Sequence, residues 1–145
     1  MKELFLDDNE FTVIPENIGY LKLNILSMKR NKIKHIHSTI EIMQSLQKLE
    51  LDFNNISDLP ASIGKCRNLR FVSISNNRLK SLSDINGLYK LATLNISRNQ
   101  ITQIENVGPF LSITEIDISH NCLEFIPQGA CIEYPDIYYV FASSY

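Results

Sequence analysis

Asparagine recurs in this chain at almost constant intervals, and this spacing constrains the fold more than any other feature of the sequence. The recurring residues are Asn9, Asn31, Asn54, Asn77, Asn99 and Asn121, separated by 22, 23, 23, 22 and 22 residues. Self-similarity at such a period is typical of solenoids and other repeat architectures, in which each unit packs only on its neighbours. We therefore expect a regular coil, with one turn for each asparagine.

Each asparagine closes the same apolar pattern. The segments LQKLELDFNNI, LRFVSISNNRL and LATLNISRNQI share the spacing L-x-x-L-x-L-x-x-N-x-L. Side chains alternate between the two faces of a strand, so Leu49 and Leu51 should point inward while Glu50 points outward. Parallel strands need a crossover of about a dozen residues, which is right-handed. The pattern predicts short parallel strands joined by return arms, whose apolar residues Ile14, Ile36, Leu59, Leu82, Ile104 and Ile126 close the core.

The recurring asparagines have a physical role in this arrangement. A side-chain amide offers two donors and a carbonyl acceptor, so directly after a strand it can satisfy backbone groups where the chain turns away. We therefore interpret the asparagines as structural residues and not as binding residues.

The return arms carry their own local signals. Pro15, Pro60 and Pro127 each follow an apolar position, where the backbone need not donate a hydrogen bond, and should begin an arm. Ser38 and Glu41 resemble a capping box, which predicts one short helix. The other arms are expected to be short helical turns or extended chain.

The repeated phrase resembles that of leucine-rich-repeat proteins over essentially the whole chain. The segments VIPENIG and DLPASIG are similar to repeats of Ras-pathway scaffold proteins, and SLSDINGLYKL and QIENVGPFL to those of phosphatase-1 regulatory subunits. Both are intracellular subclasses. The resemblance implies an α/β solenoid, a right-handed horseshoe segment with a curved parallel sheet on its concave face. It also implies a protein-binding scaffold, without identifying the partner.

The repeats predict a single domain over residues 1–145, with six full repeats and a partial seventh at 128–145. Solenoid ends normally need polar caps, and neither end shows one, so we expect a piece of a longer protein or ends that pack on something else. The last segment is rich in aromatic residues, namely Tyr134, Tyr138, Tyr139, Phe141 and Tyr145. We expect these to mediate self-association or intramolecular docking, with a ligand site as the alternative.

Charge and cysteine content limit the kinds of partner and the cellular location that the sequence predicts. Lys and Arg total 14 against 16 for Asp and Glu, so no strong field draws the chain to nucleic acid or anionic lipid. No apolar run approaches the roughly 18 residues of a membrane span. Three cysteines without paired spacing, and a start that lacks a signal-peptide core, predict a cytoplasmic location. Cys66 and Cys131 should lie in the core, and Cys122 nearer the surface.

The outward strand residues form the concave surface, and most of them are small or polar. Phe53 and Phe71 are exceptions in adjacent repeats, and aromatic residues and arginine are the usual interface anchors. The residues predicted to contact a protein partner are Phe53, Phe71, Arg70, Glu50, Asp52, Arg30 and Arg98. The alternative is that each ring only covers the aliphatic stems of its neighbours.

Enzyme chemistry has little support in the sequence. Asp117, Ser119, His120 and Ser97 can be drawn as a Ser, His and Asp grouping, but these residues are common on a polar face and no oxyanion donor is evident. We predict no catalytic activity and no cofactor.

Metal and anion sites are predicted equally weakly. His35 and His37 lack further ligands at recognisable spacing, so no metal site is predicted. The stretch from Lys29 to Lys34 alternates cations with structural residues, which favours a charged ridge over a phosphate-binding or nuclear-targeting role.

Three functions follow from these patterns. The first is a protein-interaction scaffold whose partner binds the concave face. The second is a regulatory or targeting region of a larger signalling enzyme such as a phosphatase, kinase or cyclase. The third is a structural repeat without a specific ligand.

Overall fold

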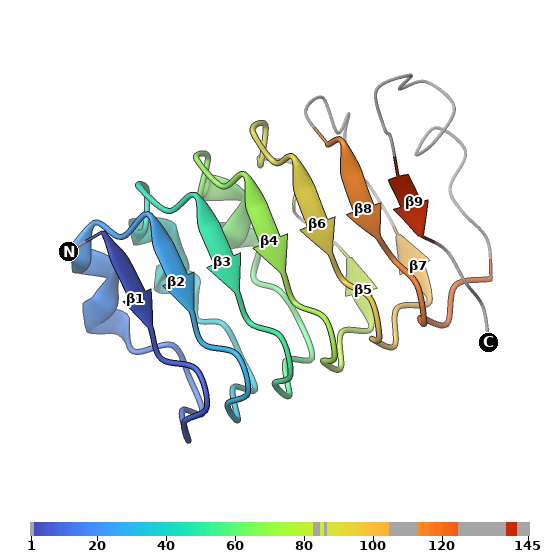
Figure 1. The fold of residues 1–145 in the computed structure, drawn as a ribbon, viewed down its shortest axis with the longest axis horizontal. Coiled ribbons are helices and arrows are strands. Elements are labelled where there is room, and N and C mark those ends of the chain that lie inside the picture. Colours follow the sequence, from blue (N-terminus) through green and yellow to red (C-terminus); the bar gives the residue numbers. More distant parts are fainter. Residues whose placement is uncertain (1, 83–84, 86, 105–112, 125–138, 142–145) are drawn as a thin grey trace.

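The computed structural model describes residues 2–82, 85, 87–104 and 113–124, together with the backbone of 139–141. Its main element is a seven-stranded parallel sheet in which every coil contributes one strand (Figure 1). The strands in spatial order are β1 (Glu3–Phe5), β2 (Ile25–Ser27), β3 (Lys48–Glu50), β4 (Phe71–Ser73), β6 (Thr93–Asn95), β8 (Glu115–Asp117) and β9 (Tyr139–Phe141). The predicted solenoid with a parallel sheet is confirmed.

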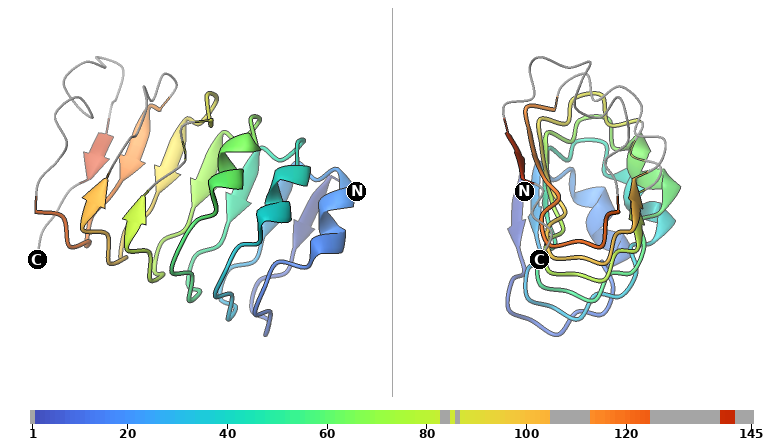
Figure 2. Two further views of the ribbon diagram at one scale, coloured as in Figure 1. Left: turned by 180° about the vertical axis from the view of Figure 1, so that it is seen from behind. Right: turned by 90° about the vertical axis from the view of Figure 1, so that its right-hand side faces the viewer.

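The return arms run along the side opposite the sheet (Figure 2). In the first three coils they form the 3₁₀ helices η1 (Glu16–Leu21), η2 (Ser38–Ile42) and η3 (Ala61–Lys65). In the next two coils the short strands β5 (Ser81–Leu82) and β7 (Gln103–Ile104) pair with each other. Pro15 and Pro60 occupy the position before η1 and η3 with φ of −62° and −72°, as expected for residues that begin an arm.

The predicted capping box at η2 is wrong, although the helix is present. Ser38 is already the first helical residue, and the cap is His37, whose Nδ1 accepts a hydrogen bond from the Thr39 backbone N–H. Glu41 instead accepts a hydrogen bond from Lys65 Nζ at 2.7 Å, in the following coil. The Glu41 carboxylate, which the sequence pattern assigned to the cap of η2, is therefore used to pair two neighbouring arms.

Two rows of apolar side chains fill the inside of the sheet. The buried residues of these rows are Leu26, Leu49, Val72, Leu94 and Ile116, then Met28, Leu51, Ile74, Ile96 and Ile118. The first row is in register from strand to strand, because Leu49 pairs with Leu26 on one side and Val72 on the other. From the arms, Ile14, Ile36, Leu82 and Ile104 are buried as predicted, whereas Leu59 is only partly buried.

The asparagines bridge each coil to the one before it. Asn77 Oδ1 accepts a hydrogen bond from Ile56 N at 2.9 Å, and Nδ2 donates to the carbonyls of Leu51, Ile74 and Ser75 at 2.9, 3.3 and 3.0 Å. The same set of bonds recurs at Asn31, Asn54, Asn99 and Asn121. Asn9 is exposed and donates only within its own turn. We call these bonds the asparagine ladder, and the predicted structural role is confirmed.

Several sequence predictions fall outside the described residues. These are the positions of Ile126, Pro127, Cys131, Tyr134, Tyr138 and Tyr145. The backbone of β9 pairs with β8 in register, with Phe141 opposite Asp117, so the sheet continues into the seventh repeat. Within the part of the chain that is described, no helix has the length and apolar character needed to cross a membrane.

The ladder predicts unequal effects for two identical substitutions. Asn77→Ala should lower the free energy of unfolding by about 1 to 3 kcal/mol, because it leaves buried backbone groups without partners. Asn9→Ala should change it by less than about 0.5 kcal/mol, as is usual for an exposed position. Urea denaturation followed by circular dichroism measures both. Equal losses for the two variants would contradict the proposed role of the ladder.

Candidate functional site

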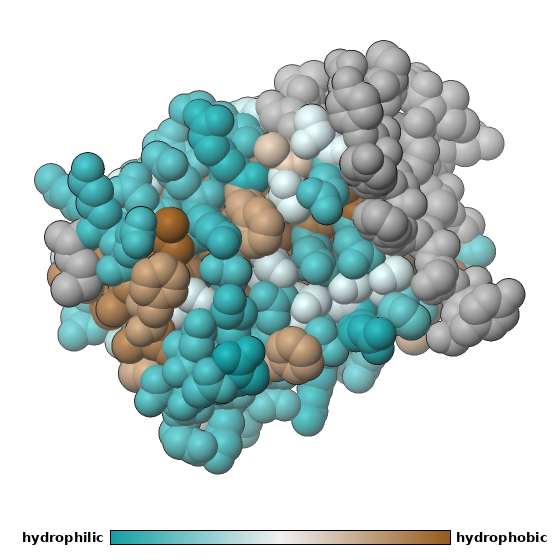
Figure 3. Space-filling model, in the orientation of Figure 1, coloured by the Kyte–Doolittle hydropathy of each residue, from teal (hydrophilic) through white to brown (hydrophobic). Residues whose placement is uncertain are grey.

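The outer face of the sheet is mostly hydrophilic or neutral, with separate hydrophobic patches (Figure 3). Phe5 and Phe53 are 59% and 53% exposed, and Phe71 is partly exposed. The residues predicted to bind a partner fall in two places. Arg70, Phe71 and Glu50 lie on or beside strands, whereas Arg30, Phe53 and Arg98 lie in the turns that follow strands.

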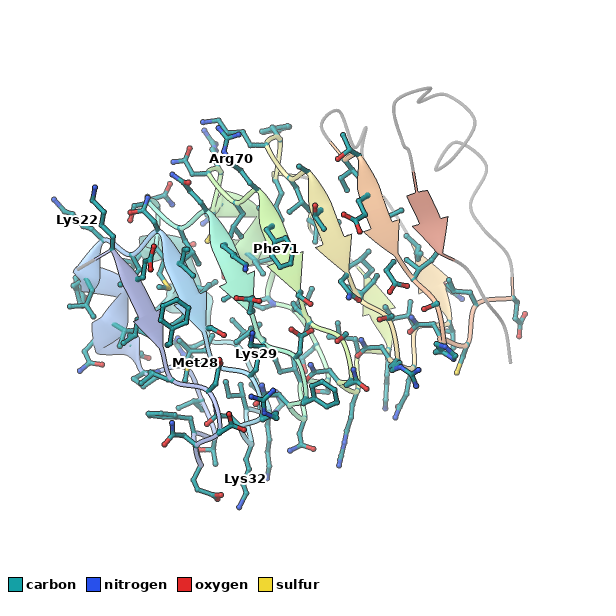
Figure 4. All side chains as sticks on the ribbon, in the orientation of Figure 1. Lys22, Met28, Lys29, Lys32, Arg70 and Phe71 are labelled. Carbon is teal, nitrogen blue, oxygen red and sulfur yellow. The ribbon has the colours of Figure 1, made fainter. Side chains whose placement is uncertain are left out.

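Phe71 is held in a chain of charged contacts across the middle of the sheet (Figure 4). Lys48 Nζ lies 4.8 Å from the centre of the Phe71 ring, which is a cation–π distance. The carboxylate of Glu50 lies 3.2 Å from Lys48 Nζ and 3.3 Å from Lys29 Nζ. Lys29 and Lys48 were missed as site residues, although Lys48 stands at the same repeat position as Phe71, 23 residues earlier.

Glu50 and Arg70 differ in how freely they can meet a partner. The Glu50 side chain is 13% exposed and already neutralises two lysines. Arg70 is exposed at the edge above Phe71, and among the described residues its side chain has no ion pair (Figure 4). The structure therefore brings Phe71, Glu50 and Arg70 together, and Arg70 keeps its donors available.

Asp52 does not lie on the accessible face, which corrects the expectation that it contacts a partner. It is 8% exposed, and its Oδ1 accepts hydrogen bonds from Ser75 N and Ser75 Oγ, at 2.8 and 2.7 Å, and from Ser73 Oγ. Asp7 accepts bonds from Ser27 Oγ and Lys29 N in the same way. Small serines on the next strand leave room for the carboxylate to turn sideways and bind them.

The turn after each of the strands β1, β2, β3, β4, β6 and β8 contains one residue in the left-handed region. Phe53 and Arg98 have φ of 57° and 54°, and the N–H of Phe53 donates to the carbonyl of Ser75 in the next coil. The residues in this row are Asp8, Arg30, Phe53, Asn76, Arg98 and His120. Left-handed backbone is rare for bulky side chains and common for Asn and Asp. Phenylalanine is therefore an unfavourable choice for the turn itself, which suggests a role outside the fold.

Two arginines of this row have different environments. Arg30 Nη2 donates to Asp8 Oδ2 at 2.7 Å, and this bond holds the pKa of Asp8 below its usual range and raises the pKa of Arg30. Arg98 is exposed and forms no ion pair with any described residue. Arg98 is therefore available to an outside carboxylate, whereas Arg30 is already paired.

The conformation of Phe53 gives a test of its role. Phe53→Asn should leave the free energy of unfolding unchanged or raise it by up to about 1 kcal/mol, because asparagine tolerates the left-handed region. Asn76 occupies the same place in the next coil and provides the matched reverse substitution, Asn76→Phe, which should be destabilising. Urea denaturation of both variants gives the comparison. A loss of about 2 kcal/mol in Phe53→Asn would show that the ring is a packing residue.

The Ser, His and Asp grouping is not assembled as a catalytic site. Asp117 Oδ1 accepts a hydrogen bond from Ser119 N at 3.0 Å, while Ser97 binds Asn95 Oδ1. His120 lies exposed in the turn row, and among the described residues no hydrogen bond joins it to Asp117 or either serine. A nucleophile needs its base within hydrogen-bonding reach, and this arrangement does not provide one.

The histidines and carboxylates of the arms form simple surface pairs. His35 lies 3.4 Å from Asp58, and His37 lies 3.3 Å from Glu16. No cluster of three or more metal-ligating side chains occurs within the described ranges.

The two described cysteines are in opposite environments. Cys66 is fully buried and its Sγ donates to the carbonyl of Ile40 at 3.2 Å. Burial, with a smaller effect from Glu41, raises the pKa of the Cys66 thiol to about 11. Cys122 is exposed. The sequence-based predictions for both residues are confirmed.

This difference predicts selective thiol labelling. In a Cys131→Ser background at pH 8, Cys122 should react readily with an aromatic disulfide reagent. Cys66 should resist until the protein unfolds, since about one thiol in a thousand is ionised three units below its pKa. Counting released chromophore before and after adding urea checks this. Prompt reaction of two thiols in the native protein would contradict the buried position of Cys66.

Comparison with known proteins places these features in a family. A family model described as leucine-rich repeats in two copies matches residues 44–87 and 67–111. Adenylate cyclase of Schizosaccharomyces pombe is 32% identical over 95 residues, which is 64% of this chain and 6% of that protein. MAP kinase phosphatase with leucine-rich repeats protein 3 of Dictyostelium discoideum is 35% identical over 75 residues, covering 51% and 9%.

Solved structures give the same result. The leucine-rich-repeat protein LIC12759 of Leptospira interrogans matches with a TM-score of 0.80 and 32% identity over 85% of this chain and 32% of that one. The TLR13 chain of a TLR13–ssRNA13 complex matches with a TM-score of 0.75 and 25% identity, over 83% and 18%.

These matches and the asparagine ladder show that the chain is a leucine-rich-repeat protein. It spans less than a tenth of the length of the two curated relatives. Repeats of this class are typically interaction modules with extended concave binding surfaces, and not catalytic domains.

Proposed function

We propose that this chain is a protein-interaction scaffold that binds a protein partner on the concave face of its sheet. The observation that carries the proposal is that adjacent coils expose two rings on the outer face, Phe71 on β4 and Phe53 in the turn after β3, with Arg70 beside Phe71 and without an ion pair among the described residues. Aromatic and arginine side chains dominate the binding energy of most protein interfaces.

The environment of the two rings supports binding over simple packing. Phe53 is 53% exposed in a backbone conformation that disfavours it, so the fold gains little from the ring. Phe71 lies under Lys48, and the Lys48 and Lys29 ammonium groups are fixed by Glu50. Such a pre-ordered surface loses less side-chain entropy when a partner binds.

A second candidate function is a regulatory or targeting region within a larger signalling enzyme. The chain matches only short parts of relatives named as a cyclase and a phosphatase, 6% and 9% of their lengths. In this case the partner would be another domain of the same protein or its substrate. We also propose a cytoplasmic location, as the sequence predicts, and self-association through the aromatic C-terminal segment as part of this second proposal.

The scaffold proposal predicts distinct effects for three phenylalanines. Phe53→Ala and Phe71→Ala should each weaken binding of a captured partner by about 1 to 3 kcal/mol, because each removes a central aromatic anchor. Phe5→Ala is the matched control, since Phe5 is equally exposed on β1, two coils from Phe53. Capture from native lysate identifies the partner, and calorimetry with the purified partner measures the affinities. Unchanged affinity in both test variants would refute the site.

A further inference from the structure

Two stretches of the fourth and fifth coils carry positive charge without a carboxylate. Residues 71–82 and 93–104, which run from each strand into its return arm, contain Arg78, Lys80 and Arg98 and no aspartate or glutamate. The whole chain has a formal net charge of −2, so these two stretches depart from the average, and the next acidic residues along the chain are Asp84 and Glu105. We call Arg78, Lys80 and Arg98 the basic edge.

Arg78, Lys80 and Arg98 follow the carboxyl ends of β4 and β6 in the sequence, and the turns after these strands lie on the same side of the solenoid (Figure 1). Arg98 occupies the turn row, and Arg78 and Lys80 follow Asn77 on either side of buried Leu79. Hydrogen bonds from Asn76 N to Ser97 O and from Gln100 N to Leu79 O hold the two coils in step. The backbones of the two coils are therefore held at about the 4.8 Å spacing of parallel strands.

Near the amino terminus most cations at the same edge are neutralised internally, although the exposed Lys34 has no ion pair among the described residues. Arg30 pairs with Asp8, and Lys32 with Glu10, each across one coil boundary. By contrast, all three residues of the basic edge are exposed, and none pairs with a carboxylate among the described residues. Carboxylates of a partner are therefore a chemical complement to these three cations, which have no such neighbour among the described residues.

Phe53 extends the basic edge with an apolar anchor. It stands in the turn row with Asn76 and Arg98, two strand spacings or about 10 Å from Arg98. The patch has defined ends, because Asp58 of the third coil and Glu124 of the sixth are both exposed carboxylates. A long polyanion that runs along the edge would meet these carboxylates, whereas a short acidic segment fits between them.

We propose that the basic edge and Phe53 bind a short acidic segment of a protein partner, with two or three carboxylates and one apolar side chain. This inference rests on the scaffold function proposed above and adds the chemistry of the partner. Arginine pairs with carboxylates in a bidentate geometry, which gives such a contact direction as well as charge. Phe53 then receives the apolar side chain of the segment.

The test uses fluorescent twelve-residue peptides and the full chain. One peptide carries four glutamates and one leucine, and a control peptide carries lysine in place of each glutamate. Arg78→Glu, Lys80→Glu and Arg98→Glu are combined in one variant. The control combines Lys2→Glu, Lys22→Glu and Arg67→Glu, with the same change of net charge at exposed positions outside the basic edge (Figure 4 places Lys22 at the opposite edge). Urea denaturation verifies that both variants fold.

We expect the acidic peptide to bind the native chain, more weakly as salt is raised. The basic-edge variant should lose at least about tenfold in affinity and gain affinity for the lysine peptide, while the control variant changes by less than about threefold. Equal losses in both variants would overturn the inference in favour of a general charge effect. Tighter binding of a single-stranded oligonucleotide of equal charge would overturn it in favour of nucleic acid.

The outcome is separable from that of the scaffold proposal. If the captured partner depends on Phe71 but binds the basic-edge variant as well as the native chain, the acidic segment is refuted and the concave-face scaffold stands. If the peptide depends on the basic edge while Phe71→Ala leaves the captured partner unaffected, the acidic site stands and the scaffold face is refuted.

Discussion

The hydrogen bonds of the asparagine ladder are the interaction on which the rest of this structure depends. Each strand of the seven-stranded sheet has three residues, after which the backbone turns away and leaves polar groups facing a buried interior. The amide of Asn54 satisfies Ile33 N and Met28 O in the preceding coil and Leu51 O in its own. Since a buried unpaired backbone group is unfavourable by about 1 to 3 kcal/mol, no coil is stable without its neighbour. The ladder therefore fixes the register of the sheet and the height of every turn.

Because the register is fixed, residues at the same repeat position form a row across the solenoid. Residues that differ in character from the rest of their row mark the candidate binding positions. The turn row has Asp8, Asn76 and His120, whose side chains tolerate left-handed backbone, but also Phe53. In the ladder row every residue is asparagine, so variation there would disrupt folding. The exposed rows are free to vary because their side chains do not satisfy buried backbone groups, and the proposed binding residues lie in these rows.

The fold could be predicted well because the period of the repeat determines it. The parallel strands, the structural role of the asparagines and the burial of Cys66 all followed from positions within the repeat. The site was less predictable. Alternation placed Asp52 on the outer face, but its carboxylate turns into the hydroxyls of Ser73 and Ser75 on the next strand. The residues in these two contacts are separated by 21 and 23 positions in the sequence. The alternation of side chains within one strand does not predict contacts between strands. Lys48 was missed for the same reason, because its role depends on the ring beside it on β4.

Electrostatics distinguish the two halves of the described surface. In the first three coils many of the charges on the sheet and its turns form internal pairs, so that Asp8 neutralises Arg30 and Glu50 neutralises Lys29 and Lys48. A partner gains little from meeting charges that are already paired, because it must displace one contact to form another. The fourth and fifth coils leave cations unpaired beside Phe53, so the electrostatic contribution to binding is concentrated there. A partner that spans the whole face would then be oriented along the solenoid, with its acidic end over Arg78 and Arg98.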